Sequence, residues 1–408
     1  MQKLGGAVIL MKENNIKYLL GEPLKEVKPL PPYDEQVCEF LADLSKRLLK
    51  DKKVTQYPDI VSFAFFCRKA NIYKLKKEFE DGKTRIGRGV VFHIAPSNVP
   101  VNCLFTYVFG LISGNANVVR VSSKNFVQVE IVCDILRKMF EEEKYEKIYR
   151  MTAFVSYEKS TEVNDMFSSL ADVRVIWGGD TTISNIRRSS LPSRAIEITF
   201  ADRYSLGIIN PRRILEASES EIRRLAEHFY NDTYLMDQNA CSTPHLLYWI
   251  SDEPSCLKSG KERFWQAVYN VAKKYNLEDI KVSDKYTLLC KYAIDLKGIK
   301  TIQKYENLLY VVTLMQLPED ISLLRGKFGL FFQYDITSLD ELSDHITKKI
   351  QTCVYYGINP FELRNIITQK SLQGIDRIVP IGSSLDIGVI WDGYDIVEHL
   401  SRVISIVS

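Results

Sequence analysis

The fold is decided by the stretch Val90-Val91-Phe92-His93-Ile94-Ala95-Pro96-Ser97-Asn98-Val99-Pro100. Its first six residues are mostly apolar and predict a buried strand, and the proline-flanked residues that follow predict a turn. Residues 101–113 then have the composition of a packed helix, and Gly114 follows where a left-handed glycine commonly ends a helix. A strand, a turn and a buried helix in this order form the first part of a βαβ unit.

The same alternation continues after this unit, although the usual dinucleotide glycine signature is missing. Strands are expected at residues 117–122, 152–156, 173–177 and 195–199, and helices at residues 126–143, 161–170 and from Thr181. Strands that alternate with helices of about ten to fifteen residues predict a parallel, doubly wound sheet. The expected fold class is therefore α/β.

The chain divides into four expected regions. A helical cap with a helix at residues 35–49 precedes the doubly wound region, and a less regular α/β region follows it. In this later region Ser218-Glu219-Ser220-Glu221 is a capping box, and residues 335–350 are expected to be a strand-to-helix junction. The last segment is expected to pack back on the other domains. The boundaries are residues 1–80, 81–204, 205–360 and 361–408.

The composition excludes several classes of protein. The 54 basic and 51 acidic residues of the 408-residue chain nearly balance, so there is no reason to expect a nucleic-acid partner. Eight cysteines occur without CxxC pairs, and none of the five histidines stands at ligand spacing. A metal site or a disulfide framework is therefore not expected, and a reducing cytoplasm is the expected location.

No membrane span is expected either. The longest apolar stretch, residues 99–119, is interrupted by a serine and three asparagines. A bilayer needs about 20 nearly uninterrupted apolar residues, so this stretch is expected to be a buried helix that runs into a strand. The apolar run at residues 5–11 is too short and too weakly flanked for a signal peptide.

Cys241 is the first candidate for chemistry. It lies in the polar stretch Asp237-Gln238-Asn239-Ala240-Cys241-Ser242-Thr243-Pro244, before an expected strand at residues 245–250. A loop at the edge of a strand gives a substrate access to a nucleophilic thiol. The alternative is a buried structural thiol, which is the common role of a cysteine. No Lys or Arg is adjacent, so any activation of the thiol must come from the fold.

Asn98 stands in the first turn of the βαβ unit. An asparagine in such a turn commonly forms only an Asx-turn. The functional alternative is an oxyanion donor, because a fixed amide beside a backbone N–H stabilises the anionic centre that forms when a thiolate attacks an acyl carbon.

Two further turns are candidates for holding a nucleotide. Arg120, Ser122, Ser123 and Lys124 end a strand at the carboxyl edge of the predicted sheet, where open α/β sheets bind nucleotides. No acidic residue is present to bind a ribose 2′-OH, which leaves room for a 2′-phosphate; the alternative is that these are solvated surface charges. Gly178, Gly179, Asp180 and Thr181 join a strand to a helix and let a backbone approach a ligand, although a plain tight turn is equally compatible.

Together these segments resemble the aldehyde dehydrogenase superfamily and, within it, the LuxC-type acyl-CoA reductases. The resemblance runs from about Gly87 to the C-terminus. Ser97-Asn98-Val99-Pro100 is similar to the asparagine turn of the superfamily, residues 114–122 to its nucleotide strand, and residues 237–244 to its nucleophile loop. The segments most particular to the LuxC type are Gly374-Ile375-Asp376-Arg377-Ile378-Val379-Pro380-Ile381-Gly382 and Trp391-Asp392-Gly393-Tyr394.

The resemblance implies an aldehyde-dehydrogenase-like fold, with a doubly wound NADP(H)-binding domain and an α/β catalytic domain. It implies Cys241 as nucleophile and Asn98 as oxyanion donor. The implied cofactor positions are Ala95, Pro96, Ser97, Arg120, Ser122, Ser123, Lys124, Gly178, Gly179, Asp180 and Thr181. One segment departs from the superfamily: Ile196-Glu197-Ile198-Thr199-Phe200-Ala201 stands where a Glu-Leu-Gly-Gly motif supplies a general base. Glu197 is thus either a catalytic residue or only a strand residue.

The expected function is NADPH-dependent reduction of a fatty acyl thioester to the aldehyde through an acyl-cysteine intermediate. The expected partners are acyl-CoA or an acyl-protein synthetase, in a protein that forms homo-oligomers. One alternative is an acyl-carrying or scaffold subunit without redox activity. The other is an NAD-dependent dehydrogenase that oxidises aldehydes, which a catalytic Glu197 favours and the Ser123-Lys124 turn opposes.

Overall fold

The computed structural model describes residues 16–97 and 99–407, which divide into two compact units. The first unit consists of the chain up to Ala201 together with Val389 onward, and the second unit is Asp202–Gly388. The expected cap and the expected cofactor domain both belong to the first unit, and the expected C-terminal segment divides between the two units. The assignment of a role to each region remains a prediction.

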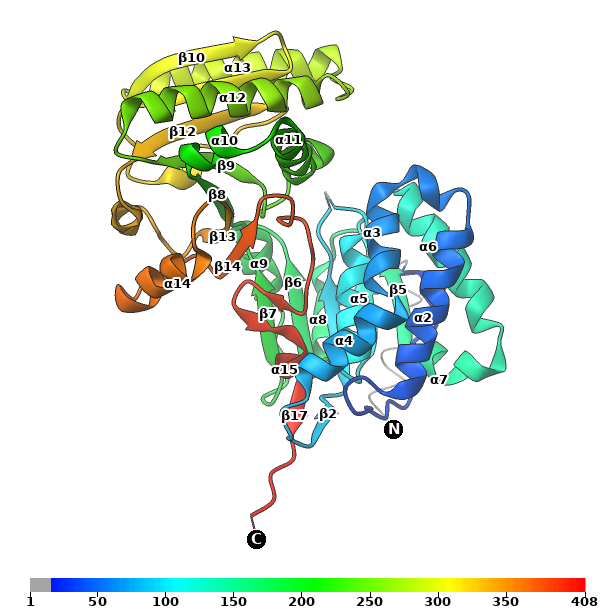
Figure 1. The fold of residues 1–408 in the computed structure, drawn as a ribbon. Helices are drawn as coiled ribbons and strands as arrows, with labels where there is room; N and C mark the ends of the chain where they lie inside the picture. The colour runs from blue at the N-terminus through cyan, green and yellow to red at the C-terminus, as the bar shows by residue number, and fades with distance from the viewer. Residues whose placement is uncertain (1–15, 98, 408) are drawn as a thin grey trace. The chain divides into compact units, whose positions relative to one another are not determined.

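A six-stranded sheet forms the centre of the described part of the first unit (Figure 1), in the order β1-β5-β4-β3-β6-β7. Its strands are β1 (Lys17–Gly21), β3 (Val90–Ile94), β4 (Ala116–Arg120), β5 (Thr152–Ser156), β6 (Val173–Trp177) and β7 (Ile196–Phe200). All neighbouring pairs are parallel except β1 with β5. The chain builds β3, β4 and β5 in one direction and then crosses to β6 on the other side of β3. The strand order therefore reverses between β3 and β6, which confirms the doubly wound prediction.

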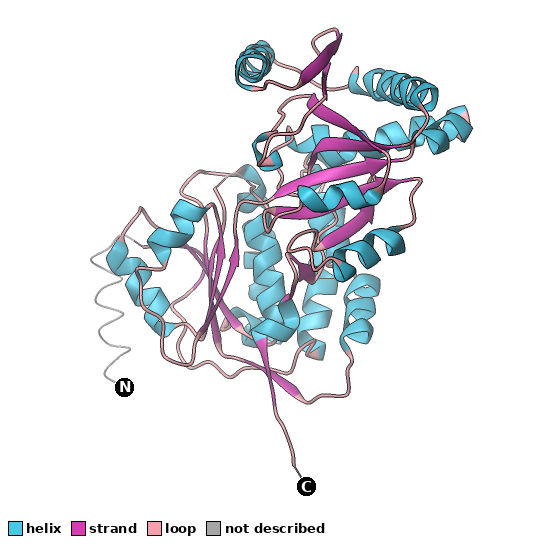
Figure 2. Ribbon diagram, turned by 90° about the vertical axis from the view of Figure 1, so that its left-hand side faces the viewer, coloured by secondary structure: helices cyan, strands magenta, loops and turns pink. Residues whose placement is uncertain are grey.

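Helices cover both faces of this sheet (Figure 2). α5 (Asn102–Ile112) lies on the face of His93, whose ring hydrogen-bonds to Thr106 of that helix. α8 (Thr161–Leu170) lies on the opposite face, where Phe92 contacts Phe167 at 5.3 Å between ring centroids. Since successive residues of a strand point to opposite faces, the two contacts follow from the alternation along β3. The remaining α-helices in the described part of this unit are α2 (Glu35–Lys50), α3 (Pro58–Phe66), α4 (Lys69–Phe79), α6 (Val127–Phe140), α7 (Glu146–Tyr149), α9 (Asp180–Ile186) and α15 (Ile396–Leu400).

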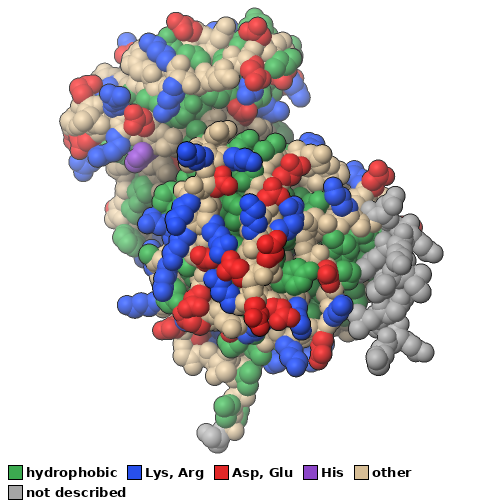
Figure 3. All heavy atoms as spheres, turned by 90° about the vertical axis from the view of Figure 1, so that its right-hand side faces the viewer, with side chains coloured by type: hydrophobic (Ala, Val, Ile, Leu, Met, Phe, Trp, Pro, Cys, Tyr) green, Lys and Arg blue, Asp and Glu red, His purple; other side chains and the backbone are tan. Residues whose placement is uncertain are grey.

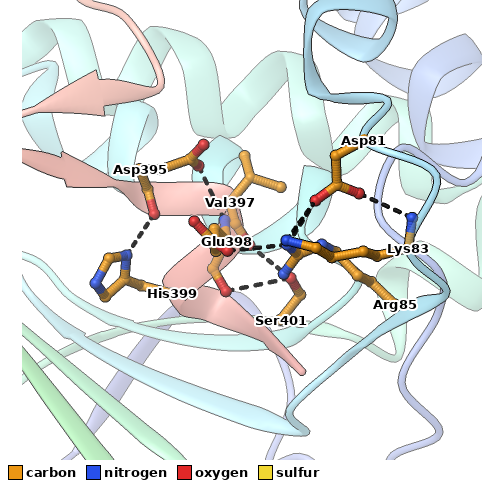
Figure 4. Close-up of polar contacts among 8 residues, drawn as sticks. All are labelled: Asp81, Lys83, Arg85, Asp395, Val397, Glu398, His399 and Ser401. Carbon is orange, nitrogen blue, oxygen red and sulfur yellow. Dashed lines mark hydrogen bonds and ion pairs between the residues drawn. The ribbon is translucent and has the colours of Figure 1, made fainter. Parts of the chain in front are cut away.

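The C-terminal segment completes the first unit. β17 (Ser401–Val403) pairs antiparallel with β2 (Arg85–Gly87), and β15 (Ile390–Trp391) pairs with β16 (Tyr394–Asp395). Figure 4 shows the buried Arg85 between two carboxylates, Asp81 and Glu398, each at 2.9 Å from its guanidinium. Residues 389–407 therefore contact the region around Arg85, and the wider prediction for residues 361–408 stays a prediction.

A seven-stranded sheet forms the second unit, which the structure describes throughout, in the order β10-β11-β12-β9-β8-β13-β14. Its strands are β8 (Tyr204–Ile209), β9 (Pro244–Ile250), β10 (Ile299–Tyr305), β11 (Leu309–Leu314), β12 (Leu330–Ile336), β13 (Ile350–Tyr356) and β14 (Arg377–Pro380). Only β10 and β11 pair antiparallel. One core cluster packs on α11 (Glu219–Thr233) and α12 (Pro254–Ala272), and the other packs on α13 (Asp279–Asp295) and α14 (Pro360–Gln369). The short α10 (Pro211–Glu216) completes the first of these layers.

Several predicted elements match the structure from end to end, namely β5, β6 and α8. The capping box at Ser218 and Glu221 is confirmed at the start of α11. Residues 335–350 do not form the predicted strand-to-helix junction. β12 ends at Ile336, and only a 3-10 helix (Leu339–Asp344) follows before β13. The prediction of a helical cap also missed β1, a five-residue edge strand without a clear alternation of apolar and polar residues. Elsewhere in residues 16–97 and 99–407, 3-10 helices occur at Val54–Gln56, Glu143–Tyr145, Tyr234–Met236 and Ile321–Leu323.

Charged side chains of both signs are interspersed on the face of the first unit that Figure 3 presents. This agrees with the near balance of basic and acidic residues in the sequence. Among the helices of residues 16–97 and 99–407, none combines the length and the apolar character that a membrane span requires.

Candidate active site

Three of the predicted cofactor turns meet at one edge of the first sheet. Residues 95–97 follow β3, residues 122–124 follow β4, and residues 178–181 begin directly after β6. β3 pairs in parallel with both β4 and β6, so the carboxyl ends of the three strands lie at the same edge. This edge includes the point where the strand order reverses, which is where doubly wound sheets bind ligands. Asn98 lies outside the described residues.

Two of the predicted cofactor residues in the turn after β4 have exposed hydrogen-bonding side chains. Ser123 and Lys124 are exposed, and the backbone N–H of Lys124 donates to Ser122 Oγ at 3.2 Å. Arg120, by contrast, lies over the ring of Tyr157, with its guanidinium carbon 4.4 Å from the ring centroid. Arg120 therefore has a cation–π partner, and Ser123 and Lys124 are the better placed of these residues to meet a ligand.

The turn after β6 leaves open space above its backbone. A Cβ atom placed on Gly179 would meet no other atom within 4 Å, and Gly179 is the N-cap of α9. Asp180 and Thr181, both exposed, form the first turn of this helix. The carboxylate of Asp180 disfavours a phosphate at this helix end, so this turn fits a close-approaching polar group better than an anion.

A buried hydrogen-bonded chain, which the sequence did not indicate, lies beneath this edge. Asn117 Oδ1 lies 2.9 Å from His93 Nε2, and His93 Nδ1 lies 2.7 Å from Thr106 Oγ1. Trp177, the last residue of β6, donates its indole N–H to the same Thr106 oxygen at 3.1 Å. Because Asn117 Nδ2 donates to the Asn115 carbonyl, its Oδ1 faces His93 and the proton of the imidazole is assigned to Nε2. Burial lowers the pKa of His93 to about 4, so the ring is neutral at pH 7.

The Gly114-Asn115 pair has a structural role. Gly114 has φ of +83°, and a Cβ there would lie 1.9 Å from the carbonyl oxygen of Leu30. Asn115 Oδ1 accepts hydrogen bonds from the N–H groups of Arg88 and Gly89, while its Nδ2 donates to the Leu400 carbonyl at 2.9 Å. These two residues thus join the entry to β3 with the C-terminal segment of the same unit.

Glu197 lies in β7 with both carboxylate oxygens occupied. Its Oε2 accepts from Arg174 Nε at 2.8 Å, and its Oε1 accepts from Arg187 Nε at 2.7 Å. A general base needs a lone pair that is available to water or substrate. The observed contacts favour the alternative that Glu197 is a strand residue with a structural ion pair.

Cys241 lies in the second unit, in the loop between the 3-10 helix Tyr234–Met236 and β9. Its side chain is half-buried, and its carbonyl oxygen accepts from Ser205 Oγ at 2.7 Å. Ser205 Oγ in turn accepts from the N–H of Thr352 at 3.2 Å. Since Ser205 and Thr352 stand near the starts of β8 and β13, the loop is fixed across the amino ends of parallel strands.

The residues before Cys241 have an unusual backbone. Asp237 and Gln238 have φ of 51° and 60°, in the left-handed region that residues other than glycine seldom adopt. Asp237 forms an ion pair with Lys281 at 3.1 Å and a hydrogen bond with Tyr275. Gln238 is buried, and both atoms of its amide are hydrogen-bonded. The sequence indicated only that these residues are polar.

Two buried titratable groups flank the loop. Burial raises the pKa of Asp232 to about 6, although its carboxylate accepts from the N–H groups of Gly382 at 2.6 Å and Ser384 at 2.9 Å. The carbonyl of Asp232 also accepts from Thr243 Oγ1 at 2.9 Å. Burial and the charge of Arg325 lower the pKa of His245 to about 3. In the described ranges, no group of three or more His, Cys, Asp or Glu side chains is arranged to bind a metal ion.

A family model described as Acyl-CoA reductase (LuxC) matches residues 25–403. The chain belongs to this family. It is similar to the long-chain acyl-protein thioester reductase of Vibrio harveyi, with 21% identity over 336 residues, and to the long-chain acyl-protein thioester reductase 2 of Photobacterium leiognathi, with 21% identity over 344 residues. Each alignment covers 79% of this chain, and the chain spans 64% of the length of each relative.

Solved structures show the fold of this LuxC-family chain. An aldehyde dehydrogenase from Mycobacterium tuberculosis, complexed with NAD+, has a TM-score of 0.60 at 12% identity, and an NAD-dependent benzaldehyde dehydrogenase from Corynebacterium glutamicum has a TM-score of 0.57 at 12% identity. Each comparison covers 91% of this chain and 84% of the other. The predicted family and the predicted aldehyde-dehydrogenase-like α/β fold are confirmed.

Proposed function

We propose that this chain reduces a long-chain acyl thioester, carried by CoA or by a protein, to the aldehyde with NADPH as reductant. The observation that carries the proposal is the half-buried Cys241 in a loop fixed by hydrogen bonds, in a chain of the acyl-CoA reductase family. The two relatives from Vibrio harveyi and Photobacterium leiognathi are named long-chain acyl-protein thioester reductases, which supports an acyl thioester as substrate.

The carboxyl edge of the first sheet fits a dinucleotide. The space above Gly179 is open, and the turn after β4 offers exposed Ser123 and Lys124 with no acidic residue from Gly114 to Val129. Lys124 would pair with a 2′-phosphate, which favours NADPH over NADH. When bound, NADPH supplies the hydride that reduces the acyl group.

Cys241 would act as the covalent nucleophile. Its sulfur attacks the acyl carbonyl, the bond to the carrier sulfur breaks, and the carrier leaves as a thiol that takes one proton. The result is an acyl-cysteine thioester in place of the original one. Asn98 is proposed as the donor that stabilises the oxyanion during this exchange. After reduction, cleavage of the C–S bond releases the aldehyde and restores Cys241.

The environment of Glu197 supports exchange with a thiol over hydrolysis. Both of its oxygens bind arginine side chains, so it offers little capacity to activate water. An enzyme that oxidises aldehydes to free acids must hydrolyse its acyl-cysteine and requires such a base. The contacts of Glu197 therefore oppose the alternative of an NAD-dependent aldehyde-oxidising dehydrogenase.

Purified protein tests the proposal through the absorbance of NADPH with acyl-CoA esters from acetyl to palmitoyl. We expect oxidation of NADPH that depends on the acyl-CoA and disappears in Cys241→Ala. Covalent acylation of Cys241 without consumption of NADPH, with either CoA or protein donors, would instead indicate an acyl-carrying subunit. An acyl-protein synthetase partner, homo-oligomers and a cytoplasmic location complete the proposal.

A further inference from the structure

The amide of Gln238 joins the nucleophile loop to the start of β12. Its Oε1 accepts from the N–H of Gly329 at 2.6 Å, and its Nε2 donates to the carbonyl of Leu330 at 3.0 Å. The side chain is only 3% exposed, so water cannot replace either bond without a structural change. We call these two hydrogen bonds the clamp. Two residues, Asn239 and Ala240, separate Gln238 from Cys241, whose thiol is proposed to react.

The backbone at Gln238 needs such a clamp. Asp237 and Gln238 adopt consecutive left-handed conformations, and glutamine, unlike asparagine or aspartate, gains no local hydrogen bond that favours this region. A conformation of this kind persists only where the surroundings determine it strongly. The two side-chain hydrogen bonds of Gln238 hold it together with the backbone bonds from Asp237 N–H to the Tyr234 carbonyl and from Gln238 N–H to the Thr233 carbonyl. The reversal of the chain at this point directs residues 239–243 toward β9.

The strand end that receives the clamp is itself held by α13. Lys285 is fully buried and donates to the carbonyls of Asn307 and Phe328, the second at 2.8 Å. Phe328 directly precedes Gly329, whose carbonyl also accepts from the N–H of Tyr310 at 2.8 Å. From the same helix, Lys281 pairs with Asp237. Helix α13 therefore braces both sides of the clamp.

We propose that Gln238 is a positioning residue for Cys241: its amide fixes the left-handed turn that sets the place of the thiol. The role rests on the proposed function, in which Cys241 is the nucleophile. Gln238 does not touch the reacting atoms, and its effect passes through the backbone of residues 239–241. A nucleophile that is displaced from its attacking position reacts more slowly at unchanged substrate affinity.

Gln333 provides a matched control in the same unit. It is also buried, and both atoms of its amide are hydrogen-bonded, to Trp265 Nε1 at 2.8 Å and to Thr313 Oγ1 at 2.8 Å. It lies within β12, however, and these partners belong to α12 and β11 and not to the loop of Cys241. The variants Gln238→Met and Gln333→Met each remove one buried, hydrogen-bonded side-chain amide. Gln238→Glu retains the acceptor for Gly329 N–H and is measured in case Gln238→Met does not fold.

Two readouts are compared: the kcat and KM for acyl-CoA reduction, and the rate of iodoacetamide labelling of Cys241 against pH, followed by mass spectrometry. Cys290 is exposed and serves as an internal reference for labelling. We expect Gln238→Met to lower kcat about tenfold with KM within about twofold, and to change the labelling rate of Cys241 at least about threefold. Gln238→Glu should give a smaller change in the same direction.

Equal kcat values and equal labelling profiles for Gln238→Met and Gln333→Met would overturn the positioning role. If Gln238→Met does not fold, a Gln238→Glu variant whose Cys241 labelling profile matches that of the wild type would overturn it. Labelling needs no catalytic turnover, so it tests the positioning of the thiol independently of the proposed function. Full activity in Cys241→Ala would refute the proposed function and would leave the labelling result valid.

Discussion

Arg174 and Glu197 stand opposite each other on the parallel strands β6 and β7, and the side chains of the buried Arg174 and the half-buried Glu197 form an ion pair. Arg174 is 3% exposed and also donates to Ser168 Oγ and to the carbonyls of Ile186 and Ser189. The pair therefore joins the last strand of the first sheet to α8 and to the residues that end α9.

Glu197→Gln should destabilise the first unit without removing activity. Loss of one partner leaves the charge of buried Arg174 without its counterion, which costs about 3 kcal/mol in the free energy of unfolding. Urea unfolding measures this loss, and the kcat of NADPH oxidation measures the activity. A fall of about a hundredfold in kcat with unchanged stability would show that Glu197 acts as a general base after all.

Lys124→Ala should reduce the preference for NADPH over NADH. The exposed ammonium is proposed to pair with the 2′-phosphate, so its loss should raise the Kd of NADPH about tenfold and leave that of NADH nearly unchanged. Fluorescence titration with both cofactors gives the two constants. Lys138→Ala, an exposed lysine in the last turn of α6, is the control. Equal effects of Lys124→Ala on both cofactors would contradict this assignment.

Thr106→Val should lower both the free energy of unfolding of the first unit and the affinity for NADPH at the carboxyl edge of its sheet. Valine cannot bond to His93 or to Trp177. Its introduction removes a partner from the buried His93 ring and from the half-buried Trp177 indole, which costs about 2 kcal/mol in the free energy of unfolding. Trp177 directly precedes Gly178, so the Kd of NADPH should also rise severalfold, as measured by titration. Thr313→Val is the matched control, since that hydroxyl is a buried partner of Gln333 in the second unit. Similar cofactor affinities in both variants would show that the buried chain does not position the edge.

Asp232→Asn should remove a specific part of the pH dependence of stability. Folding raises the pKa of Asp232 from 3.8 to about 6, so the folded protein binds this proton more tightly than the unfolded chain. The stabilising contribution is complete below about pH 4 and decreases as the pH rises to about 6, by about 3 kcal/mol at most. Urea unfolding between pH 4 and 8 gives the difference between wild type and variant, in which the other titrating groups cancel. A difference that does not vary with pH would refute the raised pKa.

The sequence predicted those elements of the first unit whose bounds are set by local residue patterns. α8 and β6 matched from end to end because Ser160 caps the helix and apolar residues fill the strand. The sequence placed the three predicted cofactor turns at one edge because each follows a strand, and parallel strands end at one edge; their binding of a cofactor stays a prediction. The loop of Cys241 was found from its polar residues before a buried strand.

What the sequence missed depends on contacts between distant residues. Nothing local to His93, Thr106 or Trp177 indicates that their side chains meet. The partners of Glu197 follow only from the pairing of β6 with β7. The clamp of Gln238 likewise requires the start of β12, which is far along the chain. These residues bear on the site, and each acts through a hydrogen-bonding partner on another element.

The pairing of β2 with β17 fixes an order of events during synthesis. On the ribosome, Arg85 emerges early and has only Asp81 as a counterion, and Glu398 and the strand partner of β2 follow after the whole of Asp202–Gly388 has been translated. The second unit is continuous in sequence, so all of its strands are available before the first unit is complete. The loop of Cys241 is thus expected to fold before β17, the last strand of the unit that is proposed to bind NADPH, has been synthesised.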